Sequence, residues 1–361
     1  MNILIDGRSV RPGQTGVGYY TEEMIRALGR VARGHEIHVL TIDKDYWGSE
    51  PTGIHLTTCS VDYERHPRGE WFLNVELPAI LRRLQADVFW GPGFLSPWVR
   101  TRARQVLTVH DLTVFSHPDC YPRRFAFYLR WAIRLGVAAA DAVVCPSRAT
   151  AEQLLTRLAP RRARVEIIPE APADAFRHET AGSYELEPFV SPPYILLVGA
   201  GDPRKRVDLA VQAFRRVAEA GFPHRLVLVG HTQAGWPGEK IVVLRRRTRD
   251  DLVSLYRYAD LLIVPSLWEG FGLPVLEAMA AGCPVLASRS GALPETGGEA
   301  AEYLDKDDPA ALADAIMRLL GDKARREEMR RLGYARAAIY SWDKSATQLL
   351  TLFESLLGGS R

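Results

Sequence analysis

The chain has 361 residues, of which 47% are hydrophobic and 25% are charged, and its formal net charge is +3. This composition is typical of a globular protein, and the length suits two domains better than one. No apolar run reaches the roughly 20 residues that span a bilayer, and the small net charge gives no reason to expect nucleic acid as a partner. The isolated cysteines predict reduced thiols in a cytoplasmic protein. They are Cys59, Cys120, Cys145 and Cys283.

The first half of the chain alternates short apolar segments with amphipathic ones. Strands are expected at Asn2–Ile5, Ile37–Thr41, Val88–Trp90, Val106–Val109, Ala142–Cys145 and Val165–Ile168. Helices are expected at Thr21–Arg30, Leu77–Leu84, Arg124–Ala139 and Arg148–Leu158. This alternation predicts a parallel sheet wrapped by helices. Because the first strand occupies residues 2–5, we expect no signal peptide.

A second alternating set follows a mostly polar, proline-containing linker. Its strands are expected at Tyr194–Val198, Leu226–Val229, Ile241–Leu244, Leu261–Val264, Val285–Ala287 and Ala301–Tyr303. Its helices are expected at Val207–Ala220, Arg249–Tyr258, Pro274–Ala281 and Pro309–Leu320, and a last helix with an apolar face at Asp343–Leu357. The prediction is an α/β chain of two tandem doubly wound, Rossmann-like domains, with the ligand in the cleft between them. The expected segments are 1–172 for the first domain, 173–192 for the linker, 193–338 for the second domain and 339–361 for the C-terminal helix.

The most informative segment lies between residues 264 and 295, where an apolar strand stops at Pro265 and a helix pattern starts near Pro274. Glu269 precedes this helix, and Glu277 is expected in its first turn. Free backbone N–H groups at a helix start attract phosphates and sugar oxygens, and carboxylates accept hydrogen bonds from hydroxyls. The segment therefore predicts a ligand that is both anionic and rich in hydroxyl groups, as a nucleotide sugar is.

A basic loop begins at Gly199, directly after the first strand of the second half. Arg204, Lys205 and Arg206 lie there at the carboxyl end of a buried strand, which is the ligand edge of a doubly wound sheet. Bases just before a helix oppose its dipole, so a solvated helix start is a poor explanation. We expect these side chains to neutralise a diphosphate.

The first half offers a weaker glycine signal and one histidine. Gly16 and Gly18 follow the first strand and allow close approach of the backbone to a ligand, although a tight turn explains them equally well. The loop lacks the third glycine of the dinucleotide fingerprint, which disfavours a nicotinamide-dependent oxidoreductase. His110 ends a strand and either reaches the cleft or forms a packed corner with Asp111.

Residues 122–136 combine arginines with aromatic residues. Arg123, Arg124, Arg130 and Arg134 interleave with Phe125, Phe127, Tyr128 and Trp131. Such a helix can lie on an anionic membrane surface, which would place the protein peripherally at the inner face of the cell membrane. The alternative is a helix packed on its own domain with its arginines in water.

Taken together, these motifs resemble glycosyltransferase family four, the retaining, nucleotide-sugar-dependent enzymes with the GT-B fold. The matching pieces occur in the correct order along nearly the whole chain. They are the Gly16/Gly18 loop, His110, the loop from Gly199 to Lys205, the block from Glu269 to Glu277, and the Gly291–Glu295 tail.

The resemblance implies a role for each matching residue in donor binding. Glu269 would bind hydroxyls of the donor sugar, and Glu277 those of the ribose. Backbone N–H groups that would contact sugar and phosphate are those of Phe271, Gly272 and Leu273. Neither glutamate is expected to act as nucleophile or general acid.

The remaining implied roles concern the diphosphate and the reacting bond. Lys205 would hold the diphosphate together with Arg204, which replaces the usual family arginine because Ala200 stands at that position. His110 would lie near the reacting bond, and Gly16 and Gly18 would close over the phosphates. A further departure is Glu170, in a Pro-Glu-Ala-Pro segment where Pro-Asn-Gly is frequent.

The Pro-Arg-Lys loop and the His-Asp-Leu segment at 110–112 resemble a subgroup that includes many bacterial mannosyltransferases of polysaccharide assembly. The resemblance implies GDP-mannose as donor, a glycan or lipid-linked acceptor, and no cofactor or metal. The aspartate pairs Asp43/Asp45 and Asp305/Asp307 fit manganese-binding spacing but are expected in turns or caps. A UDP-sugar donor, a nucleotide-sugar epimerase and an inactive binding protein of the same fold are the alternatives. The residues that set donor-base choice are expected around Ile241–Thr248.

Overall fold

The computed structural model describes residues 1–358 apart from 15, 50, 63–67, 178–189, 231–239, 246 and 305. The chain divides into two compact units. The first comprises Met1–Glu170 together with Ser341–Arg361, and the second is Ala171–Tyr340. Each unit contains one parallel sheet covered by helices, which confirms the predicted α/β class.

The sheet of the first unit has seven strands in the order β3-β2-β1-β4-β5-β6-β7, all parallel. They are β1 (Asn2–Asp6), β2 (Glu36–Thr41), β3 (Ile54–Thr58), β4 (Val88–Gly91), β5 (Arg104–Thr108), β6 (Ala142–Cys145) and β7 (Arg164–Ile167). In the register, Ile3 pairs with both Ile37 of β2 and Val88 of β4. Central strands such as β4 and β6 are buried along their whole length, as expected when helices cover both faces of a parallel sheet.

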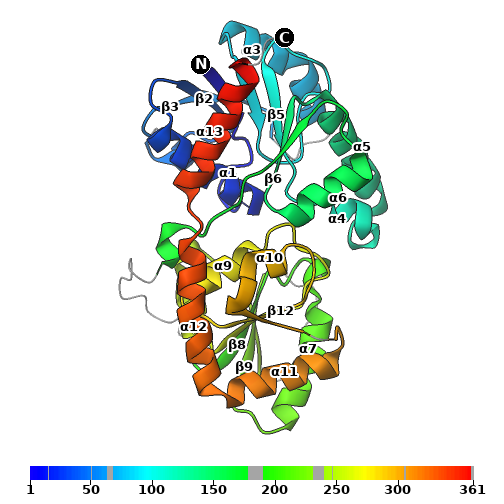
Figure 1. The fold of residues 1–361 in the computed structure, drawn as a ribbon, viewed down its shortest axis with the longest axis vertical. Helices are drawn as coiled ribbons and strands as arrows, with labels where there is room; N and C mark the ends of the chain where they lie inside the picture. Colours follow the sequence, from blue (N-terminus) through cyan, green and yellow to red (C-terminus); the bar gives the residue numbers. More distant parts are fainter. Residues whose placement is uncertain are drawn as a thin grey trace. The chain divides into compact units, whose positions relative to one another are not determined.

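The helices of the first unit come from both of the sequence segments that form this unit. They are α1 (Gly16–Val31), α2 (Arg68–Trp71), a π-helical turn η2 (Phe72–Glu76), α3 (Leu77–Arg83), α4 (Thr113–Ser116), α5 (Arg123–Ala139), α6 (Arg148–Leu158) and α13 (Trp342–Gly358). Helix α13, red in Figure 1, packs beside α1, blue. The apolar face predicted for the last helix accordingly lies inside this unit, with Ala346, Leu349 and Phe353 fully buried.

The second unit has a six-stranded parallel sheet in the order β10-β9-β8-β11-β12-β13. The strands are β8 (Tyr194–Val198), β9 (Arg225–Val229), β10 (Ile241–Leu244), β11 (Leu261–Val264), β12 (Val285–Ala287) and β13 (Ala301–Tyr303). The helices are α7 (Val207–Glu219), α8 (Arg249–Tyr258), α9 (Leu273–Ala280), α10 (Leu293–Gly297), α11 (Pro309–Gly321) and α12 (Lys323–Ala338). Short 3-10 turns of this unit are η4 (Asp174–Phe176), η6 (Pro203–Lys205) and η7 (Gly298–Ala300), and those of the first unit are η1 (Asp45–Trp47) and η3 (Pro118–Cys120).

Two apolar clusters hold the helices on opposite faces of the second sheet. Helices α7 and α11 lie together on one face, where Phe214 and Ile316 are buried (Figure 1). Helices α8 and α9 cover the other face with Tyr256, Val275 and Met279. Helix α12 packs on α9.

In both sheets the strand order reverses once, between β1 and β4 and between β8 and β11. Ligands of doubly wound proteins bind outside the carboxyl ends of the strands at this reversal. The loops after β8 and β11 carry Lys205 and Glu269, so the topology brings these two residues to one edge of one sheet. Among the described helices, none combines the length and the apolarity needed to cross a membrane.

Candidate functional site

The loops that follow β8 and β11 are held together by their backbones. The Leu267 N–H donates to the Arg204 carbonyl at 2.8 Å. Arg204 belongs to η6, whose first turn begins at Pro203, and Leu267 lies three residues after β11 ends. This bond fixes the basic loop against the loop that carries Glu269.

An ion pair between Lys205 and Glu269 forms the centre of this edge. Lys205 Nζ donates to Glu269 Oε1, and the same oxygen accepts a hydrogen bond of 2.6 Å from the Ser266 hydroxyl. The two charged side chains are only 13% and 11% exposed. A Cβ on Gly199 would lie 3.1 Å from Lys205 Cε, so the lysine side chain runs close over this glycine. The structure therefore offers one cation and one carboxylate that neutralise each other at the ligand edge.

Arg204 is engaged by a residue that the sequence interpretation did not consider. Asp202 caps η6 by accepting from the Arg204 N–H at 2.9 Å, and its carboxylate also receives the Arg204 guanidinium at 2.6–3.1 Å. Burial alone would raise the pKa of Asp202, but the hydrogen bonds and charge of Arg204 hold this pKa below its ordinary value. The expected phosphate arginine is thus paired with an acid two residues upstream. An Asp-Pro-Arg sequence at the start of a turn is the signal that could have indicated this.

The Gly291–Glu295 tail supports the backbone of Glu269. Ala292 N–H donates to the Glu269 carbonyl at 2.9 Å. Gly291 has φ +58°, and a Cβ there would come within 2.2 Å of the same carbonyl oxygen. Ser290 Oγ donates to the Leu267 carbonyl. Only glycine permits this approach, so the tail fixes the position of Glu269 by direct contact with its backbone.

Helix α9 begins directly after the loop that carries Glu269. Gly272 lies at the N-terminal boundary in a left-handed conformation with φ +91°, and α9 begins at Leu273. Phe271 is buried against Tyr340 with ring centroids 5.7 Å apart, so its side chain anchors the loop. The loop that carries Glu269 therefore leads directly into the first turn of α9.

Glu277 lies in the second turn of α9, which corrects the prediction that it occupies the first turn. Its Oε2 accepts a hydrogen bond of 3.0 Å from the Tyr256 hydroxyl of α8. Burial, followed by the charge of Glu277, raises the pKa of Tyr256 well above its ordinary value, so this phenol remains a donor. The reason for the correction is that α9 begins at Leu273, one residue before the predicted start near Pro274, which makes Glu277 the fifth residue of the helix.

In the first unit, Gly16 and Gly18 lie in the first turn of α1. A Cβ on Gly16 would meet no atom within 4 Å, so the space beside it is open. A Cβ on Gly18 would instead lie 2.6 Å from the Ser9 carbonyl and 2.5 Å from Gln14 Cβ. Gly18 is thus explained by close packing against Ser9 and Gln14 inside the unit, in a helix and not in a tight turn.

His110 lies two residues beyond β5, which ends at Thr108 and not at the predicted Val109. Its Nδ1 is 3.1 Å from Glu170 Oε1, and its Nε2 donates to the Pro92 carbonyl at 2.8 Å. The Tyr20 ring of α1 packs edge-on against the imidazole with centroids 4.6 Å apart. The first unit thus brings His110 beside the helix that starts at Gly16. Glu170 is a contact that sequence reasoning missed.

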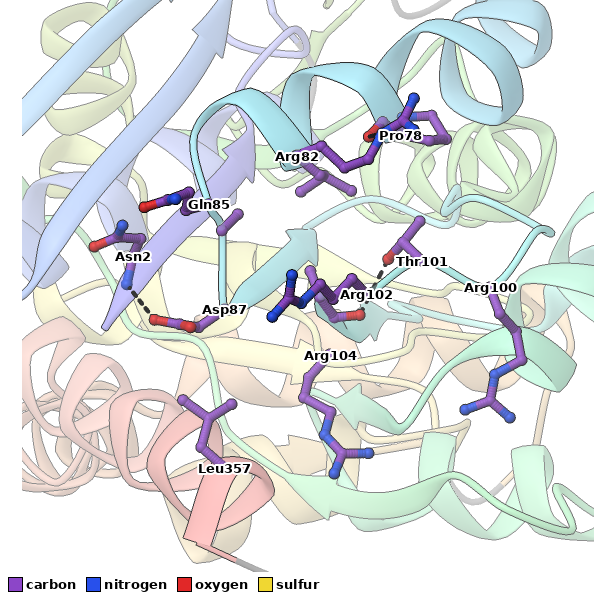
Figure 2. A pocket seen from close by; sticks show the side chains of 13 residues that line it. Asn2, Pro78, Arg82, Gln85, Asp87, Arg100, Thr101, Arg102, Arg104 and Leu357 are labelled. Atoms are coloured by element: carbon purple, nitrogen blue, oxygen red, sulfur yellow. Dashed lines mark hydrogen bonds between the residues drawn. The ribbon is translucent and has the colours of Figure 1, made fainter. Parts of the chain in front are cut away.

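A basic hollow of about 1200 Å³ lies at the opposite, amino-terminal edge of the first sheet. Figure 2 shows Arg82 projecting from α3, Arg100 and Arg102 from the segment that leads into β5, and Arg104 from the start of β5. Asp141 pairs with Arg104 at 3.3 Å and with Arg100 at 3.9 Å, and so offsets part of this charge. Its position away from the carboxyl ends of the strands separates it from the ligand edge.

Among the described residues, no three or more His, Cys, Asp or Glu side chains lie together in a way that could hold a metal ion. Asp43 Oδ1 accepts from the Tyr46 N–H at 3.0 Å, which is a turn contact. Asp305 lies outside the described residues. Near the segment expected to set base choice, Thr248 caps α8 in a reciprocal capping box with Asp251.

Two family models match successive parts of the chain. "Glycosyltransferase Family 4" matches residues 14–171, and "Glycosyl transferases group 1" matches residues 185–336. The chain is 28% identical over 302 residues to the O-antigen chain mannosyltransferase B of Escherichia coli, which covers 76% of both chains.

Solved structures share the fold over nearly the whole chain. WaaG, a glycosyltransferase involved in lipopolysaccharide biosynthesis, has a TM-score of 0.72 and 16% identity, with 99% of this chain and 100% of that chain covered. Anabaena HepE in complex with UDP and glucose has a TM-score of 0.68 and 17% identity, with 98% and 100% covered.

Two parallel Rossmann-like sheets and these matches define the class of the protein, a glycosyltransferase of the GT-B fold. More particularly, the chain belongs to glycosyltransferase family 4.

Proposed function

We propose that the protein is a retaining hexosyltransferase that moves a mannosyl group from GDP-mannose to a hydroxyl of a glycan or lipid-linked acceptor. The observation that carries the proposal is the Lys205–Glu269 pair at the strand-order reversal of the second sheet. A cation for the diphosphate and a carboxylate for sugar hydroxyls are the two groups that a nucleotide-sugar site requires. The reaction needs no cofactor and no metal in this account.

Lys205 supplies positive charge at the place where the leaving diphosphate develops negative charge. In the proposed reaction Lys205 exchanges Glu269 for the donor diphosphate, and the helix-start N–H groups near Leu273 contact the same phosphates. Fixed positive groups directed at a departing diphosphate stabilise the transition state more than the ground state. Arg204 adds to this charge, although Asp202 offsets part of it.

The two glutamates hold different parts of the donor. Glu269, released from Lys205, accepts from hydroxyls of the sugar, while Ser266 keeps its carboxylate oriented. Glu277 accepts from the ribose, and Tyr256 orients it. Both carboxylates have assigned donors in the site, and the proposal gives neither a nucleophilic role.

Retention of the anomeric configuration is proposed to occur by attack on the face from which the diphosphate leaves. The bond from the anomeric carbon to the phosphate oxygen breaks while the acceptor oxygen bonds to the same carbon. The acceptor proton passes to the departing phosphate oxygen. Protection of the donor from water would limit competing hydrolysis.

The mannosyl donor is favoured by the likeness to O-antigen chain mannosyltransferase B over 76% of both chains. A UDP-sugar donor is the second candidate, because HepE is similar in fold and its structure holds UDP and glucose. The motifs at the ligand edge bind phosphate and hydroxyl groups that both donors share, so donor choice requires a direct assay.

The test is incubation of the purified protein with GDP-mannose or UDP-glucose, with and without glycan and lipid-linked acceptors. We expect acceptor-dependent release of GDP and an α-linked product from the α-linked donor, identified from the anomeric signals in the NMR spectrum. An inverted product would contradict retention. Interconversion of epimers without nucleotide release would replace the transferase with an epimerase.

We further propose that α5 contacts an anionic membrane surface. Phe127 is 72% exposed and Trp131 is 46% exposed, and they follow each other at helical spacing with Arg134 on the same face. An exposed aromatic stripe with arginines beside it suits the interface of anionic lipids. This contact would place the enzyme peripherally at the inner face of the cell membrane, next to lipid-linked acceptors.

The membrane contact is tested by flotation with vesicles of phosphatidylglycerol and phosphatidylcholine. We expect the wild type to bind the mixed vesicles. Binding should fall in the double variant Phe127→Ser/Trp131→Ser, and it should also fall when the vesicles contain phosphatidylcholine alone. Leu155→Ser, at an exposed apolar residue of α6 in the same unit, is the matched control and should bind as the wild type does. Equal flotation of all three proteins would refute the assignment of α5.

A further inference from the structure

The imidazole of His110 is held from both sides by hydrogen-bond acceptors. Glu170 Oε1 lies 3.1 Å from Nδ1, and the Pro92 carbonyl oxygen lies 2.8 Å from Nε2. The side chains of His110 and Glu170 are 12% and 10% exposed. Water therefore has little access to either contact, and the protein atoms decide where the protons lie.

The two contacts require two hydrogens. A carbonyl oxygen can only accept, so Nε2 must carry a hydrogen to bond with Pro92. The contact of Nδ1 with the carboxylate needs a second hydrogen, whereas a neutral imidazole and a carboxylate have one between them. The extra proton can lie on the imidazole or on the carboxyl group. A charge-assisted bond from a doubly protonated ring to a carboxylate is the stronger of these two arrangements.

The other groups that surround the imidazole are two aromatic rings and one neighbouring carboxylate. The Tyr20 and Phe94 rings pack on the imidazole with centroids at 4.6 and 5.5 Å. Burial is the main cause that raises the pKa of the Tyr20 phenol above its ordinary range, so this phenol stays protonated. The neighbouring Asp111 carboxylate accepts from the Thr113 N–H at 2.9 Å. Within the described residues, Glu170 is the acid that faces the ring.

The fold fixes Glu170 by backbone contacts of the two residues that precede it. Ile168 N–H donates to the Cys145 carbonyl at 3.0 Å, which continues the β7 edge towards Glu170. The Pro169 carbonyl accepts a 2.7 Å hydrogen bond from Ser345 Oγ on α13. The Thr150 hydroxyl of α6 donates to the His110 carbonyl at 3.2 Å. Helices α6 and α13 therefore hold His110 and Glu170 in position relative to each other.

We propose that Glu170 is a positioning residue for His110, which it holds as a doubly protonated ring with both nitrogens donating. Nε2 is then committed to Pro92, so His110 does not serve as the general base for the acceptor hydroxyl. It acts through its position and positive charge. This inference rests on the proposed function only for the role of His110 in transfer, and its proton arrangement stands independently.

The proton arrangement is tested by ¹⁵N NMR of the histidine side chains in the full chain at neutral pH, with the His110 signals assigned from the spectrum of His110→Gln. We expect both ring nitrogens of His110 to show the shift of protonated nitrogen. In Glu170→Gln the amide can donate to Nδ1, and one nitrogen should become bare while Nε2 keeps its hydrogen. A bare nitrogen on His110 in the wild type would overturn the proposal, whether or not the protein transfers mannose.

The positioning role is tested by steady-state kinetics with the active donor. Glu170→Ala should lower kcat roughly 10- to 100-fold, by analogy with the loss on removing a group that orients a metal-bound histidine, while the KM for the donor changes less than about two-fold. Glu170→Gln should recover at least about five-fold over Glu170→Ala because it preserves the ring orientation. Glu166→Ala, which removes a carboxylate of β7 that pairs with Arg164 on the surface, is the matched control. If Glu170→Ala matches this control in kcat, the positioning role is wrong.

Discussion

Replacement of Gly291 by alanine probes the support behind Glu269. Gly291 has φ +58°, and a Cβ at this residue would lie 2.2 Å from the Glu269 carbonyl oxygen and 2.9 Å from its nitrogen. No real Cβ contact is so short, and the opposing atoms are backbone, which cannot swing away as a flexible side chain can. The substitution therefore forces the Glu269 loop or the Gly291 tail to move.

The cost can be estimated from two parts. A left-handed conformation costs a non-glycine residue about 1–2 kcal/mol, and relief of an overpacked contact costs about 1–3 kcal/mol more. The sum of about 2–5 kcal/mol corresponds to a fall of roughly 4–20 °C in Tm for a unit of this size. Because Ala292 N–H binds the Glu269 carbonyl, the same shift displaces the glutamate and should abolish most transfer.

Gly221→Ala is the matched control in the same unit. Gly221 has φ +88°, but a Cβ there would meet no atom within 4 Å, so this variant carries the strain without the clash. Calorimetry should show a loss of about 1–2 kcal/mol for Gly221→Ala with normal turnover. Equal destabilisation by the two variants, or normal turnover in Gly291→Ala, would refute the packing argument.

Three further outcomes follow from the structure. Burial raises the pKa of Cys283 to about 12, so iodoacetamide at pH 8 should label half-buried Cys120 and leave Cys283 unmodified in the native protein, as peptide mass spectrometry would show. Arg204 holds the pKa of Asp202 below its ordinary value, so this carboxylate contributes stability above pH about 4 that is lost as the pH falls further. Compared with the wild type, Asp202→Asn should therefore lose less stability in thermal melts between about pH 5 and pH 3, and an equal loss would count against the pairing. Transfer should survive EDTA and the Asp43→Ala change, and an EDTA-sensitive wild type would contradict the metal-free proposal.

Most of the fold was predictable because buried parallel strands appear as short apolar runs. All six strands of the second sheet and the α/β class follow from these runs. Strand β3 (Ile54–Thr58) was missed because it lies at the sheet edge and mixes His55 and two threonines with its apolar residues. Helix α12 was missed because only Met329, Gly333 and Ala337 of its sixteen residues are buried, which leaves no apolar stripe to recognise.

The candidate site was predictable in its location more than in its contacts. Strand ends placed Lys205 and Glu269 at one edge, but their direct pairing depends on the spacing of two loops 64 residues apart in sequence. Local rules could have found the Asp202 cap of Arg204, since it spans two residues. The contact of Glu170 with His110 depends on how β7 and β5 end relative to each other and on α13, which no local pattern encodes.

The measurement that tests the central claim most directly is turnover of GDP-mannose by Lys205→Ala and Glu269→Gln. Lys240→Ala and Glu299→Gln, which change exposed residues of the same unit, are the controls. We expect each site variant to lose roughly 100- to 1000-fold in turnover, the usual cost of removing one group that stabilises developing charge, while its fold is preserved by circular dichroism. Near-normal turnover in either site variant, at a level equal to its control, would contradict the assignment of this pair to the donor.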